Sequence, residues 1–568
     1  MKNYNELLSG YENTRLIRYD DESEETLKKV FYDDLPQNYV EGVLKGNHYE
    51  NGRLVQVYSE RETHVAVVAA TRLGKTTQYV IPTILSFARQ PKKRSMVISD
   101  PKGELYKTTS ETLRQEGYNV RLINFRNFLN SEYWNPLTPI FRAYKAMAAI
   151  EDEVKVVETE NGLRNEFRGV IYDSQSKLDM RLRNVKRLAY EDIVNAVDEM
   201  AFKLISTERT EDPYWEDSAR ELLKACIWGM LEDSDGSDRG MKITEESFSL
   251  ATVLSIMDGM HDDSGPKYND GGYFTSRPKN SKAYVLAKNC IIENGIQTRK
   301  CIVSTFNTKM SVYRSSTVRM ITSCNSFEMD ELLSENGPIA VYIDYKDEVK
   351  AHYEVISAFV QNAYGYLIEY ANSGESGKLD VPFYFILDEF GNFPAIKDFE
   401  NVISACGGRN IYFVLVLQSY AQLDNVYGKE VSEIIRDNMN QHVFIGSNNP
   451  VTLEEFSKEC GEWTRIAPIT ALVGDKKDIT DFRIETIPLM PKSTLAAMKV
   501  GECVITEANC GYVMLSKMER FYLCEEMNSL PVARESDYTP SVDALDDKYV
   551  CTRKCDEDDD DDDDEFTF

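Results

Sequence analysis

The chain lacks the sequence features of exported and membrane-spanning proteins. Its first 45 residues are polar and charged, without the basic start, apolar stretch and cleavage site of a signal peptide. The longest apolar runs, such as Ile411–Leu417, fall well short of the roughly 20 residues that cross a bilayer. We therefore expect a cytoplasmic protein without a transmembrane segment, in which the short apolar runs form buried parallel strands.

Patterns typical of zinc sites and disulfide frameworks are also missing. The 11 cysteines include no CxxC pair and show no regular spacing. Cys551 and Cys555 lie close together near the end of the chain, but no second ligand pair accompanies them, so we interpret them as free thiols. The cysteine content therefore fits a reducing compartment.

Positive charge is also outnumbered, with 65 lysines and arginines against 94 aspartates and glutamates. The formal net charge is −29, and residues 556–565 contribute ten of these negatives, which leaves −19 on the remainder. Neutralising nucleic-acid phosphates requires clustered lysines and arginines. The composition therefore excludes a broad DNA-coating surface and confines any contact with nucleic acid to a channel or patch.

What the chain does contain is enough apolar sequence for more than one core. It has 568 residues, 42% of them hydrophobic, which predicts a multi-part globular protein. From the changes in composition we expect a polar lead-in (1–54), a nucleotide-binding domain in two parts (55–140 and 331–536), an inserted all-α domain (141–330) and an acidic tail (537–568) that is disordered by composition.

The two outer parts alternate between strand-like and helix-like segments. Strands are predicted at 63–69, 95–100 and 119–125, with a helix at 76–87, and strands return at 338–344, 383–388, 411–417 and 442–445. This alternation is typical of a parallel α/β sheet. Between them, 190–207 and 214–231 show helical periodicity, whereas 151–189 is predicted to be an exposed excursion and 265–282 a loop.

A phosphate-binding loop follows the first strand. The pattern G-x-x-x-x-G-K-[ST] is matched except that Ala69 replaces the first glycine, and we assign nucleotide binding to Ala70, Thr71, Arg72, Leu73, Gly74, Lys75, Thr76 and Thr77. Lys75 would reach the β- and γ-phosphates of ATP, and the Thr76 hydroxyl would hold Mg²⁺. An accidental GKT in a loop is the alternative, but the apolar strand before it and the helix after it favour the phosphate loop.

A pair of carboxylates ends the strand at 383–388. Asp388 is predicted to bind Mg²⁺ through water, and Glu389 to polarise the attacking water as a general base. The alternative is a solvated pair that caps the next helix, since carboxylates favour helix starts. The lysine loop upstream favours the catalytic interpretation.

Two further polar residues flank the strand Ile411–Leu417. Gln418 follows it and would contact the γ-phosphate or its water, unless it only caps the next helix. Arg409 precedes it and could act as an arginine finger toward a neighbouring subunit, although an ordinary surface arginine is the simpler interpretation.

These motifs, in this order, resemble the type IV coupling proteins of bacterial conjugation and type IV secretion (the TraG/TraD-like ATPases). The resemblance rests on six segments covering about residues 60–450: Thr71-Arg72-Leu73-Gly74-Lys75-Thr76 with Val80-Ile81-Pro82-Thr83, Asp100-Pro101-Lys102-Gly103-Glu104-Leu105-Tyr106, Trp134-Asn135-Pro136-Leu137, Asp212-Pro213-Tyr214-Trp215-Glu216-Asp217-Ser218-Ala219-Arg220, Asp388-Glu389-Phe390 and Gln418-Ser419-Tyr420-Ala421-Gln422-Leu423.

The resemblance implies a RecA-like P-loop NTPase domain with an inserted all-α domain, assembling as a hexamer around DNA. It implies ATP and Mg²⁺ as cofactors, and single-stranded DNA with relaxase and channel components as partners. The family also carries Ala or Gly at the position of Ala69. This sequence departs from the family in lacking N-terminal transmembrane helices, so it resembles a soluble variant docked to the membrane through a partner, and in having Cys406-Gly407-Gly408 where many relatives have another arginine near Arg409.

The acidic tail fits the same family in outline. Some coupling proteins recruit basic processing proteins through an acidic C-terminus, and here the tail runs from Asp556 to Phe568 with Phe566 and Phe568 at its end. The aromatic rings would anchor in a partner while the acids steer it. The alternative is a tail that only keeps the protein soluble.

We thus predict an ATP-driven coupling protein that delivers relaxase-bound DNA, or protein, to a secretion channel. A second hypothesis is a nucleotide-gated docking adaptor that binds relaxosome or effector proteins without pumping DNA. A partitioning or repair translocase of the same fold is disfavoured by the signature that starts at Asp100.

Overall fold

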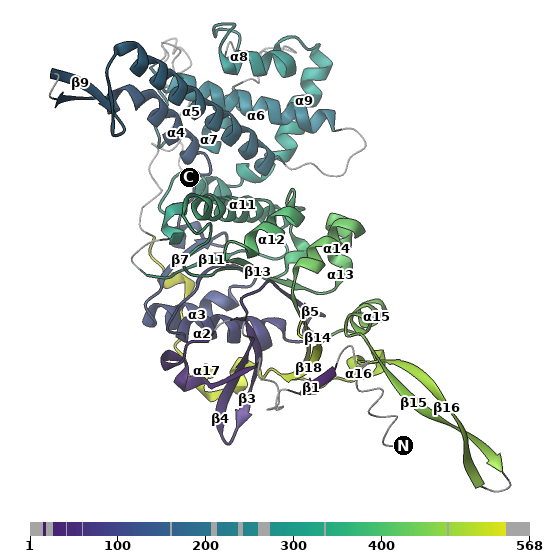
Figure 1. Cartoon of the computed structure of the whole chain (residues 1–568). Helices are drawn as coiled ribbons and strands as arrows, with labels where there is room; N and C mark the ends of the chain where they lie inside the picture. Colours follow the sequence, from purple (N-terminus) through teal and green to yellow (C-terminus); the bar gives the residue numbers. More distant parts are fainter. Residues whose placement is uncertain are drawn as a thin grey trace. The chain divides into compact units, whose positions relative to one another are not determined.

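The computed structural model (Figure 1) describes residues 15–18, 27–40, 42–59, 61–159, 162–205, 213–236, 242–259, 273–333, 337–473 and 476–540. They belong to two compact units: unit 1 is Met1–Arg126 with Met329–Tyr538, and unit 2 is Asn127–Glu328 with Thr539–Phe568. The predicted acidic tail beyond residue 540, Cys551, Cys555 and the first 14 residues lie outside the described residues.

Unit 1 is built on a ten-stranded sheet. Its order is β1 (Arg15–Arg18), β18 (Tyr512–Lys517), β17 (Glu502–Glu507), β14 (Gln441–Gly446), β5 (Val65–Ala69), β13 (Ile411–Leu417), β12 (Phe383–Leu387), β6 (Ser95–Asp100), β11 (Ile339–Asp344) and β7 (Asn119–Asn124). The seven strands from β14 to β7 are parallel, and β17 joins them antiparallel. The predicted α/β fold is confirmed.

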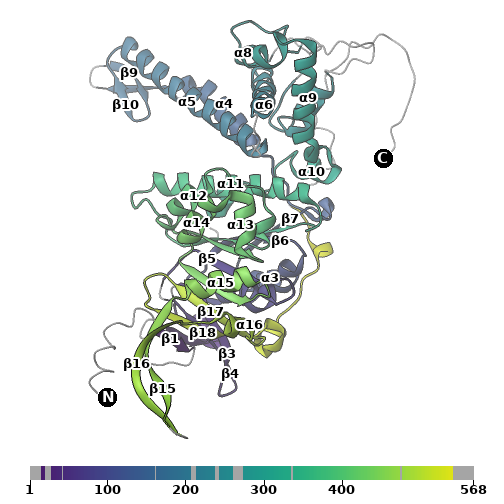
Figure 2. The ribbon, with the colours of Figure 1, turned by 90° about the vertical axis from the view of Figure 1, so that its right-hand side faces the viewer.

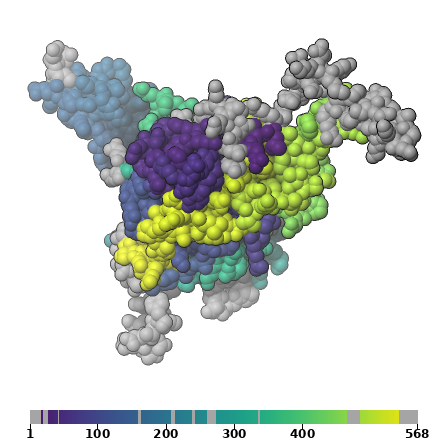
Figure 3. All heavy atoms as spheres, turned by 90° about the horizontal axis from the view of Figure 1, so that it is seen from below, coloured from purple at the N-terminus to yellow at the C-terminus, as the bar shows by residue number. Residues whose placement is uncertain are grey.

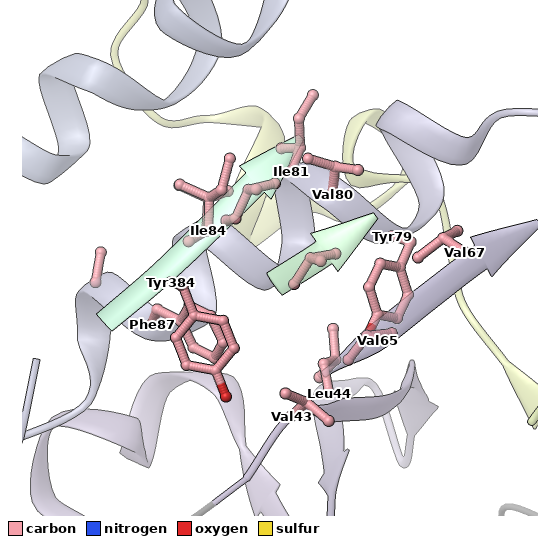
Figure 4. Close-up of a cluster of buried hydrophobic side chains, with 14 of the residues drawn as sticks. Val43, Leu44, Val65, Val67, Tyr79, Val80, Ile81, Ile84, Phe87 and Tyr384 are labelled. Atoms are coloured by element: carbon pink, nitrogen blue, oxygen red, sulfur yellow. The ribbon is translucent and has the colours of Figure 1, made fainter. Parts of the chain in front are cut away.

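The central strands are buried on both faces, which explains their continuous apolar sequences. On one face, Val65 and Val67 lie beside Tyr79, and the ring centroid of Phe87 lies 4.7 Å from that of Tyr384 (Figure 4). On the other face, Phe399 of α12 (Phe399–Gly407) contacts Phe413 at 5.3 Å between ring centroids. Side chains alternate between these two layers because a strand turns successive residues to opposite faces.

Helices cover both faces of the sheet (Figures 1 and 2). A π-helical turn, η2 (Thr76–Val80), in which the Ile81 N–H donates to the Thr76 carbonyl, leads into α2 (Ile81–Arg89), where Pro82 has no N–H to donate. The remaining helices of unit 1 are α3 (Glu104–Gln115), α11 (Lys350–Ser373), α12, α13 (Tyr420–Tyr427), α14 (Lys429–Asn438), α15 (Pro450–Glu459), α16 (Lys492–Ala496) and α17 (Glu525–Asn528).

Two parts of unit 1 differ from the sequence-based expectation. The region interpreted as a polar lead-in contains a sheet of order β2 (Lys28–Phe31), β4 (Arg53–Tyr58) and β3 (Leu44–Glu50). In Figure 4, Val43 and Leu44 lie with the core side chains next to Val65. A long antiparallel hairpin, β15 (Glu462–Val473) and β16 (Lys476–Pro488), was not predicted either.

Unit 2 is mainly helical, as expected. Its helices are α4 (Thr138–Ala148), α5 (Gln175–Leu204), α6 (Tyr214–Asp233), α7 (Leu250–Asp258), α8 (Lys282–Ala287), α9 (Ile296–Lys309) and α10 (Ser316–Ile321). The predicted excursion at 151–189 is exposed over most of its described residues, but it has regular structure that was not predicted: it forms the sheet β10 (Val170–Tyr172), β9 (Gly162–Phe167) and β8 (Lys155–Thr159) and the first half of α5. A small core of Phe167, Leu178, Leu182 and Val185 holds this region, with too few apolar residues to stand out from the charged sequence.

No helix among the described residues is long and apolar enough to span a membrane.

Candidate functional site

The phosphate loop is formed where β5 ends. The Ala70 N–H donates to the Gly446 carbonyl of the neighbouring strand at 2.9 Å, and the Leu73 N–H donates back to the Ala70 carbonyl at 3.2 Å. Arg72 and Gly74 adopt positive φ angles of 68° and 97°. These angles turn the chain sharply into the helix, and glycine adopts such a conformation without steric cost at residue 74.

The remaining loop residues have distinct environments. Thr71 and Arg72 are exposed, Leu73 is half-buried, and the Thr77 hydroxyl donates to the Gly74 carbonyl at 3.3 Å. The first turn of the following helix presents backbone N–H groups that have no acceptor within the helix. Such groups, with the positive end of the helix dipole, favour phosphate oxygens.

Lys75 and Glu389 form a buried ion pair at the carboxyl edge of the sheet. The Lys75 Nζ lies 2.7 Å from Glu389 Oε1, and the two residues are only 6% and 7% exposed. Glu389 adopts a left-handed backbone conformation with φ of 54°, which is uncommon for a non-glycine residue. The predicted phosphate-binding cation and the predicted general base thus contact each other directly.

Thr76 and Asp388 form the second contact between the loop and the end of β12. The Thr76 hydroxyl donates to Asp388 Oδ2 at 3.1 Å, while Asp388 Oδ1 accepts the Glu389 N–H at 2.9 Å. Burial raises the pKa of Asp388, and the positive charge of Lys75 opposes that rise. A hydroxyl next to a carboxylate is the oxygen pair that Mg²⁺ takes in P-loop sites.

Gln418 joins the same cluster from the end of β13. Its Nε2 donates to Glu389 Oε2 at 3.0 Å, and its backbone N–H donates to Gln422 Oε1 of α13 at 2.9 Å. The Gln422 side chain leaves no room at Gly391, where an added Cβ would lie 2.5 Å from Gln422 Oε1. The Glu389 carboxylate is therefore linked to the start of α13 through the Gln418 residue.

Arg409 is not brought to this cluster. It precedes β13 at the opposite edge, separated from Gln418 by the whole seven-residue strand, which is about 20 Å long. Its Nε donates to Asn372 Oδ1 at 2.9 Å and its Nη1 donates to the Ala405 carbonyl at 2.8 Å, at the end of α12. Within its own subunit Arg409 stabilises a helix terminus, and the arginine-finger role toward another subunit stays a prediction.

A second acidic pair, which the sequence motifs did not predict as a site, lies at the ends of two neighbouring strands. Asp100 and Asp344 end the adjacent strands β6 and β11, and Arg126 Nε lies 2.7 Å from Asp344 Oδ1. Burial, reinforced by the negative charges nearby, raises the pKa of Asp100 to about 7 and that of Asp344 to about 8. The signature at Asp100 pointed to this edge, but no local pattern marked Asp344.

The assembled side chains suit one class of ligand. An ammonium group, a hydroxyl next to a carboxylate, and a row of helix N–H groups together match a nucleoside triphosphate with Mg²⁺. A second carboxylate, held by an amide donor, suits the activation of water. The described residues contain no cluster of three or more histidines, cysteines and carboxylates suited to hold a metal by themselves.

Comparison with known protein sequences gives consistent matches. Residues 18–478 match the family described as Type IV secretory system Conjugative DNA transfer. Protein VirD4 of Rhizobium rhizogenes is 21% identical over 426 residues, covering 74% of this chain and 51% of that protein. Conjugal transfer protein TraG of Escherichia coli is 22% identical over 459 residues, covering 79% of this chain and 61% of TraG. The chain thus spans about half to three fifths of these relatives.

Among solved structures, the bacterial conjugative coupling protein TrwBdeltaN70 in its unbound form has a TM-score of 0.52 at 14% identity, covering 80% of this chain and 84% of that one. TrwB in complex with a non-hydrolysable ATP analogue has a TM-score of 0.51 at the same identity, covering 80% of this chain and 85% of that one. At this identity the likeness supports the fold: a RecA-like P-loop domain with a helical insertion.

Proposed function

The chain belongs to the family of type IV secretory system proteins for conjugative DNA transfer, and on that premise we propose that it is an ATPase that couples substrate recruitment to secretion. It recruits relaxase-bound single-stranded DNA, or a protein substrate, and delivers it to a type IV secretion channel. The observation that carries this proposal is the cluster of Lys75, Glu389 and Gln418 beside Thr76 and Asp388.

In the proposed reaction, the resting ion pair is exchanged for contacts with the triphosphate. Lys75 leaves Glu389 and neutralises the β- and γ-phosphate oxygens. Glu389 then has a free carboxylate that accepts a proton from the attacking water. Mg²⁺, held by Thr76 and through water by Asp388, would neutralise negative charge that builds up on the phosphates.

Gln418 is the proposed sensor of the nucleotide. In the resting state its amide donates to Glu389, whereas a bound γ-phosphate or its water would offer another acceptor. Because the Gln418 backbone N–H donates to the Gln422 side chain, a shift of Gln418 would move the start of α13. Hydrolysis of the nucleotide would in this way change the position of a helix in unit 1.

The partners follow from the family and from charge. We propose a homo-hexamer with DNA in a central channel, since a net charge of −19 outside residues 556–565 leaves little basic surface for DNA elsewhere. We place the protein at the inner face of the cell membrane, held by a component of the secretion channel. The relative TraG is named a conjugal transfer protein, which supports a role in transfer.

ATP hydrolysis with and without single-stranded DNA tests the proposal. Wild-type protein should hydrolyse ATP faster with DNA, and Lys75→Ala should lose at least two orders of magnitude of activity. Lys458→Ala removes a 74% exposed lysine and serves as the matched control with wild-type activity. Equal inactivity of wild type and Lys75→Ala under every DNA condition would rule out the motor.

The alternative is a nucleotide-gated docking adaptor, which the acidic body favours over a DNA pump. In that case the tail that includes Asp556 and Phe568 would recruit basic relaxosome or effector proteins. Removing residues 551–568 should then abolish capture of those proteins while ATP hydrolysis persists without stimulation by DNA. DNA-stimulated hydrolysis in the truncated protein would instead favour the motor.

A further inference from the structure

The chain returns to the phosphate loop after its last strand. Beyond β18, the Met518 N–H donates to the Gly501 carbonyl and the Glu519 N–H donates to the Asn47 carbonyl, both at 2.7 Å. These bonds fix the segment between β17 and the N-terminal sheet, and Figure 3 shows the C-terminal segment in yellow beside the N-terminal segment in purple. The next residue, Arg520, is thereby placed at the loop.

The Arg520 guanidinium lies against the loop backbone. Its Nη2 donates to the Leu73 carbonyl at 3.3 Å, and its Nη1 donates to the Tyr522 hydroxyl at 2.7 Å. A Cβ added to Gly74 would meet Nε at 3.1 Å and Nη2 at 3.2 Å. The cation therefore occupies the space that a side chain at residue 74 would fill, directly before Lys75.

This cation is incompletely satisfied. The Arg520 Nε is buried and has no hydrogen-bond partner, the two other hydrogen bonds of the guanidinium go to neutral oxygens, and its carbon lies 6.0 Å from the centroid of the Tyr522 ring. No described carboxylate forms an ion pair with it, in contrast to Lys75 with Glu389. A half-buried arginine with a free donor and no counter-charge favours an anion, and guanidinium groups bind phosphate oxygens with two parallel donors.

We propose that Arg520 binds the α- and β-phosphates of the nucleotide in the same subunit, with Tyr522 as a positioning residue that holds the guanidinium. The α- and β-phosphates are those that the loop backbone cradles, and Arg520 contacts that backbone. The inference rests on the proposed ATP-binding function. Because ATP and ADP share these phosphates, Arg520 would contribute to the binding of both.

The test is equilibrium binding of fluorescent ATP and ADP to the full chain. Arg520→Ala should weaken both nucleotides roughly tenfold or more, as expected for loss of a charge-assisted contact, and Arg520→Lys should recover part of the loss. Arg520→Ala should also reduce the salt dependence of nucleotide binding, since one cation fewer contacts the phosphates. Arg534→Ala removes an exposed arginine of the same segment and should leave the Kd of both nucleotides unchanged.

Tyr522→Phe tests the positioning role. It should lower the affinity for both nucleotides a few-fold in the wild-type background. It should cause no further loss of affinity in Arg520→Ala, because the hydroxyl acts only through the guanidinium. Additive losses would overturn this role. Thermal unfolding without nucleotide checks that each variant is folded, and if Arg520→Ala does not fold, Arg520→Lys and Tyr522→Phe decide.

The outcomes separate the inference from the function. If wild type binds nucleotide and Arg520→Ala binds ATP and ADP as tightly, the inference is wrong and the proposed function stands. Weaker binding of ATP alone would place Arg520 at the γ-phosphate and overturn its assignment to the α- and β-phosphates. If wild type binds neither nucleotide, the function and the inference fall together.

Discussion

Replacing Glu389 by glutamine should destabilise the nucleotide-free protein and at the same time increase the degree to which ATP stabilises it. Lys75 and Glu389 are 6% and 7% exposed, and their charged atoms lie 2.7 Å apart. Removing one partner of a buried ion pair typically costs about 3–5 kcal/mol, because the other charge stays buried without compensation. Since a glutamine oxygen still accepts a hydrogen bond from Lys75, we expect about 3 kcal/mol.

Part of this cost should be recovered when ATP binds. Wild-type protein must break the ion pair to place Lys75 on the phosphates, whereas Glu389→Gln has no such pair to break. Recovery of about half the cost, roughly 1.4 kcal/mol, corresponds to a tenfold lower Kd. Hydrolysis should fall by about 10² to 10⁴, because an amide cannot accept the proton of water.

Thermal unfolding with and without ATP and Mg²⁺ measures the effect. The matched control is Glu507→Gln, which removes the carboxylate partner of Lys45, another buried lysine, whose pair has side chains only 1% and 3% exposed. This control should be destabilised to a similar degree, but ATP should not stabilise it more than it stabilises wild type. If ATP stabilises Glu389→Gln no more than wild type, the ion pair does not compete with the nucleotide and our reasoning is refuted.

Three further predictions concern other residues of the two units. Thr76→Ala and Asp388→Asn should each raise the Mg²⁺ concentration needed for half-maximal hydrolysis about tenfold or more, and an unchanged Mg²⁺ titration would contradict their assignment as metal ligands. Asp100 and Asp344 have pKa values raised from 3.8 to about 7 and 8, so the folded state binds more protons than the unfolded state between about pH 4 and 8. Their contribution to the free energy of unfolding therefore falls as pH rises through this window, and Asp100→Asn should lessen the fall in urea titrations from pH 5 to 8.5; a steeper fall would show that the sign is wrong. Leu178→Ala removes most of a side chain that is 2% exposed and should lower the free energy of unfolding of unit 2 by about 2–5 kcal/mol. Faster hydrogen exchange in α5 would show this loss, whereas nucleotide binding by unit 1 should not change.

The strands that carry the site were predictable because they are apolar on both faces. Val65–Ala69 and Ile411–Leu417 are continuous apolar runs between polar segments, which is the pattern of central parallel strands. Parallel strands bring their carboxyl ends to one edge, so the meeting of Lys75, Glu389 and Gln418 followed from the order of motifs.

The N-terminal sheet was missed because its buried residues include many polar ones. Lys45, Asn47 and Gln56 are at most 1% exposed, and each finds a partner inside the protein. Lys45 Nζ donates to the Tyr512 hydroxyl at 2.9 Å, and Gln56 Nε2 donates to Asn47 Oδ1 at 3.2 Å. Sequence patterns equate polar with exposed, and partners more than 400 residues away cannot be recognised locally.

Arg520 was missed for a related reason. It follows the last strand of the sheet, and nothing around it resembles a nucleotide motif. Its place beside Gly74 depends on the pairing of β18 with β17 and on the bonds to Gly501 and Asn47. Contacts of this kind are set by the register of distant strands, which the sequence pattern does not reveal.

The close approach of Gln422 to Gly391 restricts how these two positions can change during evolution. Any side chain at residue 391 would collide with the amide that holds the Gln418 N–H. Because the added Cβ would also lie 2.7 Å from Gln422 Cβ, a lineage that acquires alanine there must replace residue 422 by glycine or shift the backbone. With glycine at 422 it loses the amide that ties Gln418 to α13. We therefore expect the two positions to covary among relatives, with glycine at 391 wherever glutamine is kept at 422, and an alignment with independent variation would show that the constraint is absent.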